Sequence, residues 1–188
     1  MDNDKMEPYK FGTLEEGVPF VYPNVWKQGK TTGPDRLVIA PASGQIDLIR
    51  KLTAVLPEPF GILYVLLVPR SGGEEGRYQS PKPFTRDELE AFLSQFQEFF
   101  ERDARHNLWI RSLPASSTLV YDNHNVIYAY GQLKDFKSVL AQQGLQEGEV
   151  HFPDPHSHNY NVEFDQAERD VMSYSEWLHS PLAEQEKR

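Results

Sequence analysis

Residues 60–69 read FGILYVLLVP, the longest uninterrupted apolar run in the sequence. The run is shorter than the roughly 20 apolar residues that a membrane-spanning helix needs. Pro57 and Pro59 precede it and Pro69 closes it, which disfavours a helix. A strand with one solvated face would alternate polar and apolar residues. The run therefore predicts a strand that is buried on both faces.

The sequence after this strand contains two amphipathic patterns that predict helices covering a sheet. Thr85 and Glu88 have the spacing of a capping box, and apolar residues then repeat at helical spacing to about residue 104. A second helical pattern, over residues 133–143, ends before Gly144, a typical C′ residue. Strand patterns and a turn formed by the letters DNHN surround these helices, with predicted strands at 108–113, 118–121, 126–130 and 149–152.

The order of these elements over residues 60–152 is β-α-β-β-α-β. It predicts an α+β fold with a mainly antiparallel sheet, helices packed on it and a ferredoxin-like core. Residues 1–36 predict an irregular N-terminal arm with at most one short strand, and residues 37–59 an extra strand and helix. Residues 153–188 predict a loop followed by a C-terminal helix.

Two further details of these flanking segments are predicted from local signals. Ser43 is expected to cap the extra helix, and Asp165 with Glu168 to form a capping box at the start of the C-terminal helix. The segment 70–83, rich in Gly and Pro, predicts a solvated loop. We find no linker that would divide the chain, and expect residues 1–188 to form a single domain.

Composition limits the classes of function. The formal net charge is −9, from 28 acidic and 19 basic side chains, which argues against nucleic-acid binding and leaves open a basic protein partner or a metal ion. The chain has no cysteine, so disulfides and thiolate chemistry are excluded. The first twelve residues are polar, without the apolar core of a secretory signal. We therefore expect a cytoplasmic protein that does not associate with membranes.

The segment 151–161, HFPDPHSHNYN, is the densest cluster of metal-ligating residue types. In an extended segment His156 and His158 project to the same side, and His151 or Asp154 could supply a third ligand to Zn²⁺ or another divalent ion. The pair Asp122 and His124 in the predicted turn is an alternative donor set. The plainer interpretation is that histidines in a Pro-rich loop are solvated or bonded to the backbone.

Two other segments are candidate sites. Tyr121, Tyr128 and Tyr130 on the predicted hairpin, with Trp109 nearby, would form an interaction surface if exposed and part of the core if buried. The loop at 70–83 carries Arg70, Arg77 and Lys82 and leads into a helix N-terminus, where anions are often held. It matches no phosphate-binding motif, which favours a plain surface loop.

No nucleophilic motif is present, and the paired carboxylates are explained by helix starts and loops. The sequence therefore favours a non-enzymatic, protein-binding module of inhibitory, immunity-like or regulatory type. The alternative is a metal-dependent hydrolase that uses the histidine cluster at 151–158. A small-molecule sensor that uses the open face of the sheet is a third hypothesis, based on fold analogy. The sequence does not predict the oligomeric state.

Overall fold

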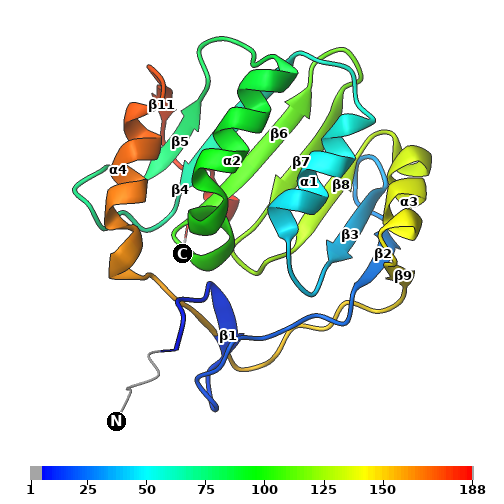
Figure 1. The fold of residues 1–188 in the computed structure, drawn as a ribbon, viewed down its shortest axis with the longest axis horizontal. Helices are drawn as coiled ribbons and strands as arrows, with labels where there is room; N and C mark the ends of the chain where they lie inside the picture. Colours follow the sequence, from blue (N-terminus) through cyan, green and yellow to red (C-terminus); the bar gives the residue numbers. More distant parts are fainter. Residues whose placement is uncertain (1–5, 188) are drawn as a thin grey trace.

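The computed structural model describes residues 6–187, and its main feature is one nine-stranded sheet (Figure 1). In chain order, its strands are β2 (Val25–Gly29), β3 (Arg36–Ala40), β4 (Phe60–Leu66), β5 (Gly76–Gln79), β6 (His106–Ser112), β7 (Ser117–Tyr121), β8 (Ile127–Tyr130), β9 (Gln146–Glu147) and β11 (Leu178–Ser180). Across the sheet the order is β11-β5-β4-β6-β7-β8-β3-β2-β9. Every pairing is antiparallel except β2 with β9.

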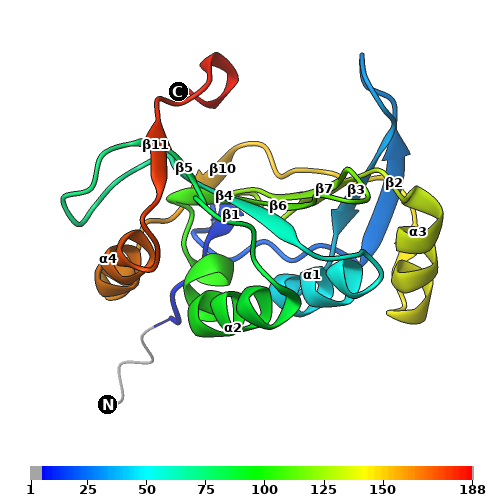
Figure 2. The ribbon, with the colours of Figure 1, turned by 90° about the horizontal axis from the view of Figure 1, so that it is seen from above.

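Four α-helices within the described residues accompany the sheet: α1 (Gln45–Ala54), α2 (Arg86–Arg102), α3 (Leu133–Gln142) and α4 (Asp165–Ser173). Seen from above, α1 and α2 lie on one side of the sheet, whereas the C-terminal end of the chain lies on the other (Figure 2). The prediction of an α+β fold with a mainly antiparallel sheet is confirmed. None of the helices within residues 6–187 is both long and apolar enough to cross a membrane.

The predicted capping box forms at the start of α2. The Glu88 backbone N–H donates to Thr85 Oγ1 at 3.3 Å, and the Thr85 N–H donates to the Glu88 carboxylate at 2.7 Å. The buried face of α2 then packs on the sheet through the residues that the periodicity selected, Leu89, Phe92, Leu93, Phe96, Phe99 and Phe100. Gly144, with φ of 77°, ends α3 at the predicted position.

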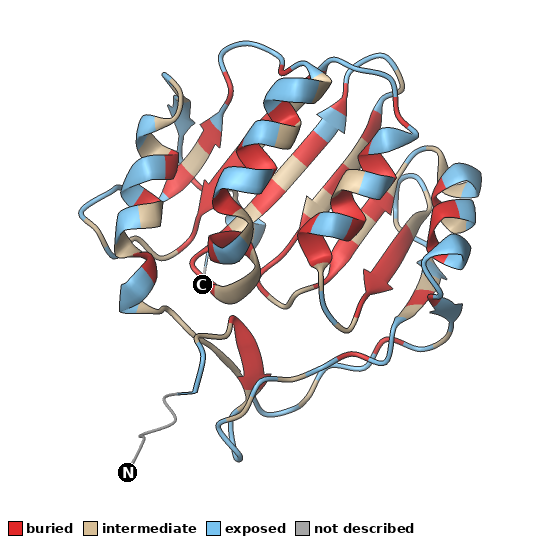
Figure 3. Cartoon of the chain, in the orientation of Figure 1, coloured by how far each residue is buried: buried red, intermediate tan, exposed pale blue. Residues whose placement is uncertain are grey.

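The central strand β4 is buried on both faces only in its second half. Ile62 and Tyr64 face the helices and are fully buried, whereas Leu63 on the opposite face is half-buried. Buried and half-buried residues alternate in the same way along the neighbouring strands (Figure 3). Val65 is also buried, because Leu182 from the C-terminal segment packs over it. The run is therefore apolar because the helices cover one face of β4 and the C-terminal segment covers part of the other face.

The ferredoxin-like arrangement is not confirmed. The segment at 70–83, predicted to be a loop, contains β5, which pairs with β4. This extra strand reverses the chain before α2, so β6 lies beside β4 and antiparallel to it. A split βαβ unit instead joins two parallel strands through its helix. The predicted strand at 149–152 is absent, and the short β9 precedes it.

The two ends of the chain are more regular than predicted. The arm contributes β2 to the main sheet and β1 (Phe11–Thr13) to a separate two-stranded sheet with β10 (His156–His158). Residues 1–5 of the arm lie outside the described residues. Helix α1 has Gly44 rather than Ser43 as its N-cap, and α4 starts without the predicted capping box. Leu178, within the segment where the sequence predicts a loop and a C-terminal helix, lies in β11 at the sheet edge.

Candidate functional site

The face of the sheet opposite α1 and α2 carries a row of large apolar side chains. Trp109 on β6 lies opposite Leu63 on β4 and Val120 on β7, and Tyr128 on β8 lies opposite Val120. Each of these residues is half-buried, in contrast to their fully buried neighbours along the strands. Because side chains alternate between the two faces, these residues share the face opposite the helices. We call it the open face. Other segments cover the two ends of this face: Tyr128 packs against a buried cluster that includes Tyr22 and Val38, and Trp109 packs against the cluster of Val65, Leu67 and Leu182.

Arginines interleave with these aromatic rings. Arg36 donates to the Tyr130 hydroxyl at 3.0 Å, and its guanidinium carbon lies 4.6 Å from the centre of the Tyr128 ring. The guanidinium carbon of Arg77 lies 5.5 Å from the centre of the Trp109 ring. Guanidinium groups stack favourably on aromatic faces at such distances. The open face therefore carries guanidinium groups on a chain whose net charge is −9, and one of them, Arg77, is paired with the chain's own Glu186.

Arg111 is the most available charge on this face. It is exposed, and it makes no hydrogen bond or ion pair with any residue that the structure describes. It borders an open pocket of about 290 Å³ together with Arg77 and Trp109. Gly61 lies directly opposite Arg111 and lacks a side chain that could fill the space. The pocket thus combines an aromatic wall with two guanidinium groups.

The chain's own C-terminal segment occupies the end of the open face next to this pocket. After β11 pairs with β5, Leu182 packs against Val65 and Leu67. Glu186 then accepts a hydrogen bond from Arg77 Nη1 at 2.8 Å. A segment with one apolar side chain, Leu182, and one carboxylate in a 3₁₀ turn at Glu184–Glu186 is therefore already seated on this surface.

The structure brings together three of the four aromatic residues that the sequence singled out. Trp109, Tyr128 and Tyr130 lie on the open face. Tyr121 lies on the opposite face, fully buried, where its hydroxyl donates to Asn125 Oδ1 at 2.7 Å. Burial raises the pKa of Tyr121 well above its usual value. Tyr121 is therefore part of the core rather than of an interaction surface.

The histidines group differently from the predicted set. Ligand nitrogens of His124, His156 and His158 all lie within 4.8 Å of one another. His151 and Asp154 are exposed and do not belong to this group. His124 comes from the turn between β7 and β8, which the sequence offered only as an alternative donor set. The two segments meet because β10 pairs with β1, whose Phe11 ring contacts all three imidazoles.

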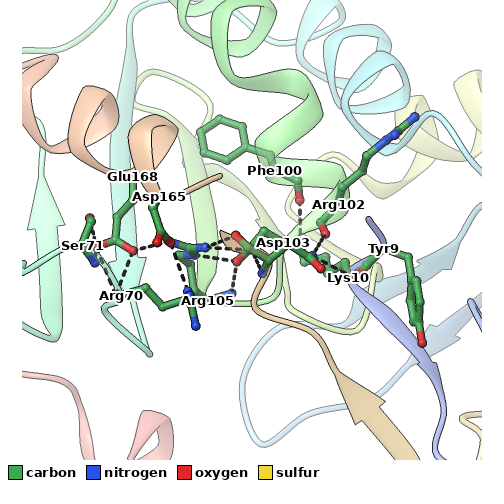
Figure 4. Close-up of polar contacts among 11 residues, drawn as sticks. Tyr9, Lys10, Arg70, Ser71, Phe100, Arg102, Asp103, Arg105, Asp165 and Glu168 are labelled. Atoms are coloured by element: carbon green, nitrogen blue, oxygen red, sulfur yellow. Dashed lines mark hydrogen bonds and ion pairs between the residues drawn. The ribbon is translucent and has the colours of Figure 1, made fainter. Parts of the chain in front are cut away.

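A buried ion network, which the sequence did not predict, joins α4 to the sheet (Figure 4). Arg105 is fully buried and donates to Asp103 Oδ1 at 2.7 Å and to Glu168 Oε2 at 2.7 Å. Asp165 also accepts from Arg105, at 3.0 Å. Burial alone would lower the pKa of Arg105, but the bonds to Asp103 and Glu168 outweigh it and raise that pKa. The predicted capping pair of α4 is thus engaged in holding this arginine.

The same network also holds the start of the segment at 70–83 in place. The backbone N–H groups of Arg70 and Ser71 donate to the Glu168 carboxylate at 3.0–3.3 Å. The sequence offered this loop as a candidate anion site. The anion that its N–H groups bind in the structure is the carboxylate of Glu168, a residue of the same chain. All of the charged groups in the network have partners, which indicates a structural rather than a catalytic role.

Comparison of the chain with models of protein families, with curated proteins and with solved structures gives no match.

Proposed function

We propose that this protein is a protein-binding module, and that it binds an acidic, extended segment of its partner on the open face. The observation that carries this proposal is the pocket between Arg77, Trp109 and Arg111, next to a surface where the chain's own Leu182 and Glu186 are already seated. Aromatic and arginine side chains are enriched among the residues that dominate protein–protein binding energy. The inhibitory, immunity-like or regulatory role expected from the sequence fits such a module.

We infer the charge of the partner from the charged groups on the open face and not from the net charge of the whole chain. The net charge of −9 predicts a basic partner. At physiological ionic strength, however, charges more than about 8 Å apart are largely screened. A segment in contact with the pocket therefore experiences Arg111, and Arg77 with its partner Glu186, more strongly than the acidic groups elsewhere. Guanidinium groups bind carboxylates in two-point geometry, which favours Asp or Glu in the partner segment.

The pocket and Arg111 indicate which side chains the bound segment of the partner carries. The pocket of about 290 Å³ suits an apolar or aromatic side chain that packs against Trp109. A carboxylate a few residues away would reach Arg111, as Glu186 reaches Arg77. The partner would thus repeat the pattern of the C-terminal segment, one apolar anchor followed by an acidic residue.

Site-directed photo-crosslinking in native cells tests this proposal. A photoreactive amino acid replaces Leu113, an exposed residue that borders the same pocket, in one variant and Lys134 in another. Lys134 is an exposed residue on α3, away from the open face. We expect one protein to be crosslinked from position 113 and not from position 134, through an acidic segment that contains an apolar residue. Equal capture at both positions, or crosslinks from position 113 to nucleic acid, would contradict the proposal.

A second candidate function, metal-dependent hydrolysis, is favoured by one observation: His124 joins His156 and His158 in a group of three. An ion held by three imidazoles keeps a coordination position for water and lowers the pKa of that water towards neutrality. This candidate requires the metal, so hydrolysis of an activated ester should appear with Zn²⁺ and disappear with a chelator. A metal-loaded protein without hydrolytic activity would count against this second function alone.

A further inference from the structure

The three imidazoles of the histidine group come from two segments that are distant in the sequence. His124 lies in the turn that follows β7, and His156 and His158 lie at the two ends of β10. The ring centres are 4.6 Å apart for His124 and His158, and 5.2–5.3 Å apart for the other two pairs. The rings meet at interplanar angles of 68–73°. The rings therefore meet edge to face rather than stacking face to face.

The tautomers of two of these rings are set by acceptors that cannot donate a proton. His124 Nδ1 lies 3.0 Å from Asp122 Oδ2, and His156 Nδ1 lies 3.1 Å from the carbonyl oxygen of Pro153. Each Nδ1 must carry the proton in such a bond, so each neutral ring presents the lone pair of Nε2. Histidines that bind metal ions almost always donate their other ring N–H to a carboxylate or a backbone carbonyl in this way.

The surroundings of the group are apolar on one side and open on the other. The Phe11 ring lies 5.2–5.7 Å from all three imidazoles, and the Phe152 ring lies 5.4 Å from His124. His124 and His158 are half-buried, whereas His156 is exposed. An ion can thus enter from solvent at His156. The apolar floor at Phe11 would strengthen its interaction with the imidazoles.

From this geometry we infer that His124, His156 and His158 bind one divalent transition-metal ion, with Zn²⁺ as a suitable probe. Imidazole nitrogens bind Zn²⁺ at about 2.0–2.1 Å, which places the ligand nitrogens of a tetrahedral site about 3.3–3.4 Å apart. The nitrogens here lie within 4.8 Å of one another, so the rings need to approach by up to about 1.5 Å. The exposed His156 can make that movement by rotation of its side chain.

The bound ion would add a link between parts of the fold that already share an apolar cluster around Phe11. It would link the two-stranded sheet of β1 and β10 to the turn between β7 and β8 of the main sheet. A ligand that binds only the folded chain must raise its melting temperature. This inference is independent of the proposed binding face, and it is a precondition of the hydrolase alternative.

The test measures the metal content and Zn²⁺ affinity of the full chain, purified without a histidine tag. We expect one ion per chain, a melting temperature that rises with Zn²⁺ and falls with chelator, and affinity at least about tenfold weaker in His156→Gln. The matched control is His151→Gln, the same change at an exposed histidine of the same loop outside the group. Its affinity should equal that of the unmodified chain.

A second variant examines the carboxylate behind His124. In Asp122→Asn the side-chain oxygen can still accept from the His124 and Val126 backbone N–H groups, as Oδ1 does now. The amide nitrogen would instead face His124 Nδ1 and favour the tautomer whose Nε2 is protonated. Loss of such a partner typically weakens metal binding about 10–100-fold. Absence of Zn²⁺ binding by the folded chain, or a full equivalent retained by His156→Gln/His158→Gln, would overturn the inference.

Discussion

Lys10 places its ammonium group inside the protein. Its Nζ donates to the Phe100 carbonyl oxygen at 2.9 Å and lies 3.8 Å from the centre of the Tyr121 ring. Burial lowers the pKa of Lys10 to about 7, although Asp122 and Asp103 act in the opposite direction. Nothing in the sequence around Lys10 predicts this burial, because its partners lie some 90 residues further along the chain.

The lowered pKa of Lys10 makes stability depend on pH. Between about pH 7 and 9.5 the unfolded chain keeps Lys10 protonated, since its pKa there is near 10.5, while the folded chain releases that proton. The free energy of unfolding should therefore rise with pH, by up to about 1.4 kcal/mol per pH unit from this group. Urea titrations of the unmodified chain and of Lys10→Met should diverge over this range, with Lys134→Met as an exposed control. Parallel curves for Lys10→Met would contradict this account.

Arg105 is the second residue whose partners were not evident from sequence. Its guanidinium bonds to Asp103, Asp165 and Glu168, and Asp165 and Glu168 had been assigned to a helix cap. Local spacing fits both roles of Asp165 and Glu168. Only the position of α4 beside the connection between α2 and β6, which carries Asp103 and Arg105, decides between them. The sequence therefore predicted the residues of α4 but not what their side chains bind.

Replacing Arg105 by Met should leave Asp103 and Glu168 as buried charges without their principal partner. Breaking a buried pair in this way costs about 3–5 kcal/mol of the free energy of unfolding. Arg169→Met, in the exposed face of α4, should change it by less than about 0.5 kcal/mol. Chemical denaturation of both variants provides the comparison. A loss at Arg105 no larger than at Arg169 would show that the network contributes nothing to stability.

At the scale of elements, the sequence predicted helices better than short strands. Helix α2 was placed correctly because its cap and its apolar face are local features of residues 85–102. The strands β5, β9, β10 and β11 have two to four residues each, and they exist only where a partner strand is available. No pattern of two to four residues specifies such a partner, so the strand expected at 149–152 was wrong and these four were missed.

The cap of α2 can be tested directly. Thr85→Ala removes the oxygen that accepts from the Glu88 N–H, and should lower the free energy of unfolding by about 1 kcal/mol. Thr85→Ser keeps a hydroxyl in the same place and should retain most of the stability. Thermal or urea melts of the two variants would measure this. Equal losses in both would indicate that the side-chain packing of Thr85 matters, and not the cap.

At the scale of the whole molecule, the sequence predicted the α+β class but not the strand order. The order depends on β5, which reverses the chain, and on pairings between segments as distant as β3 and β8. The same limit applies to the open face and to the histidine group, whose members the fold brings together. Net charge describes the molecule on average and predicted a basic partner, whereas strand register gathers Arg36, Arg77 and Arg111 on one face. Likewise, spacing linked His156 to His158, but only the packing of β10 near the β7–β8 turn added His124.

The most direct test of the open face is the affinity of the crosslinked partner, once purified, for charge-reversed variants of this chain. Arg111→Glu should weaken binding at least about tenfold, because it places a carboxylate against the acidic segment. The weakening should shrink at high ionic strength as the charges are screened. Lys134→Glu, the same change on α3, should bind like the unmodified chain. Equal affinities for Arg111→Glu and the unmodified chain would contradict binding at the open face.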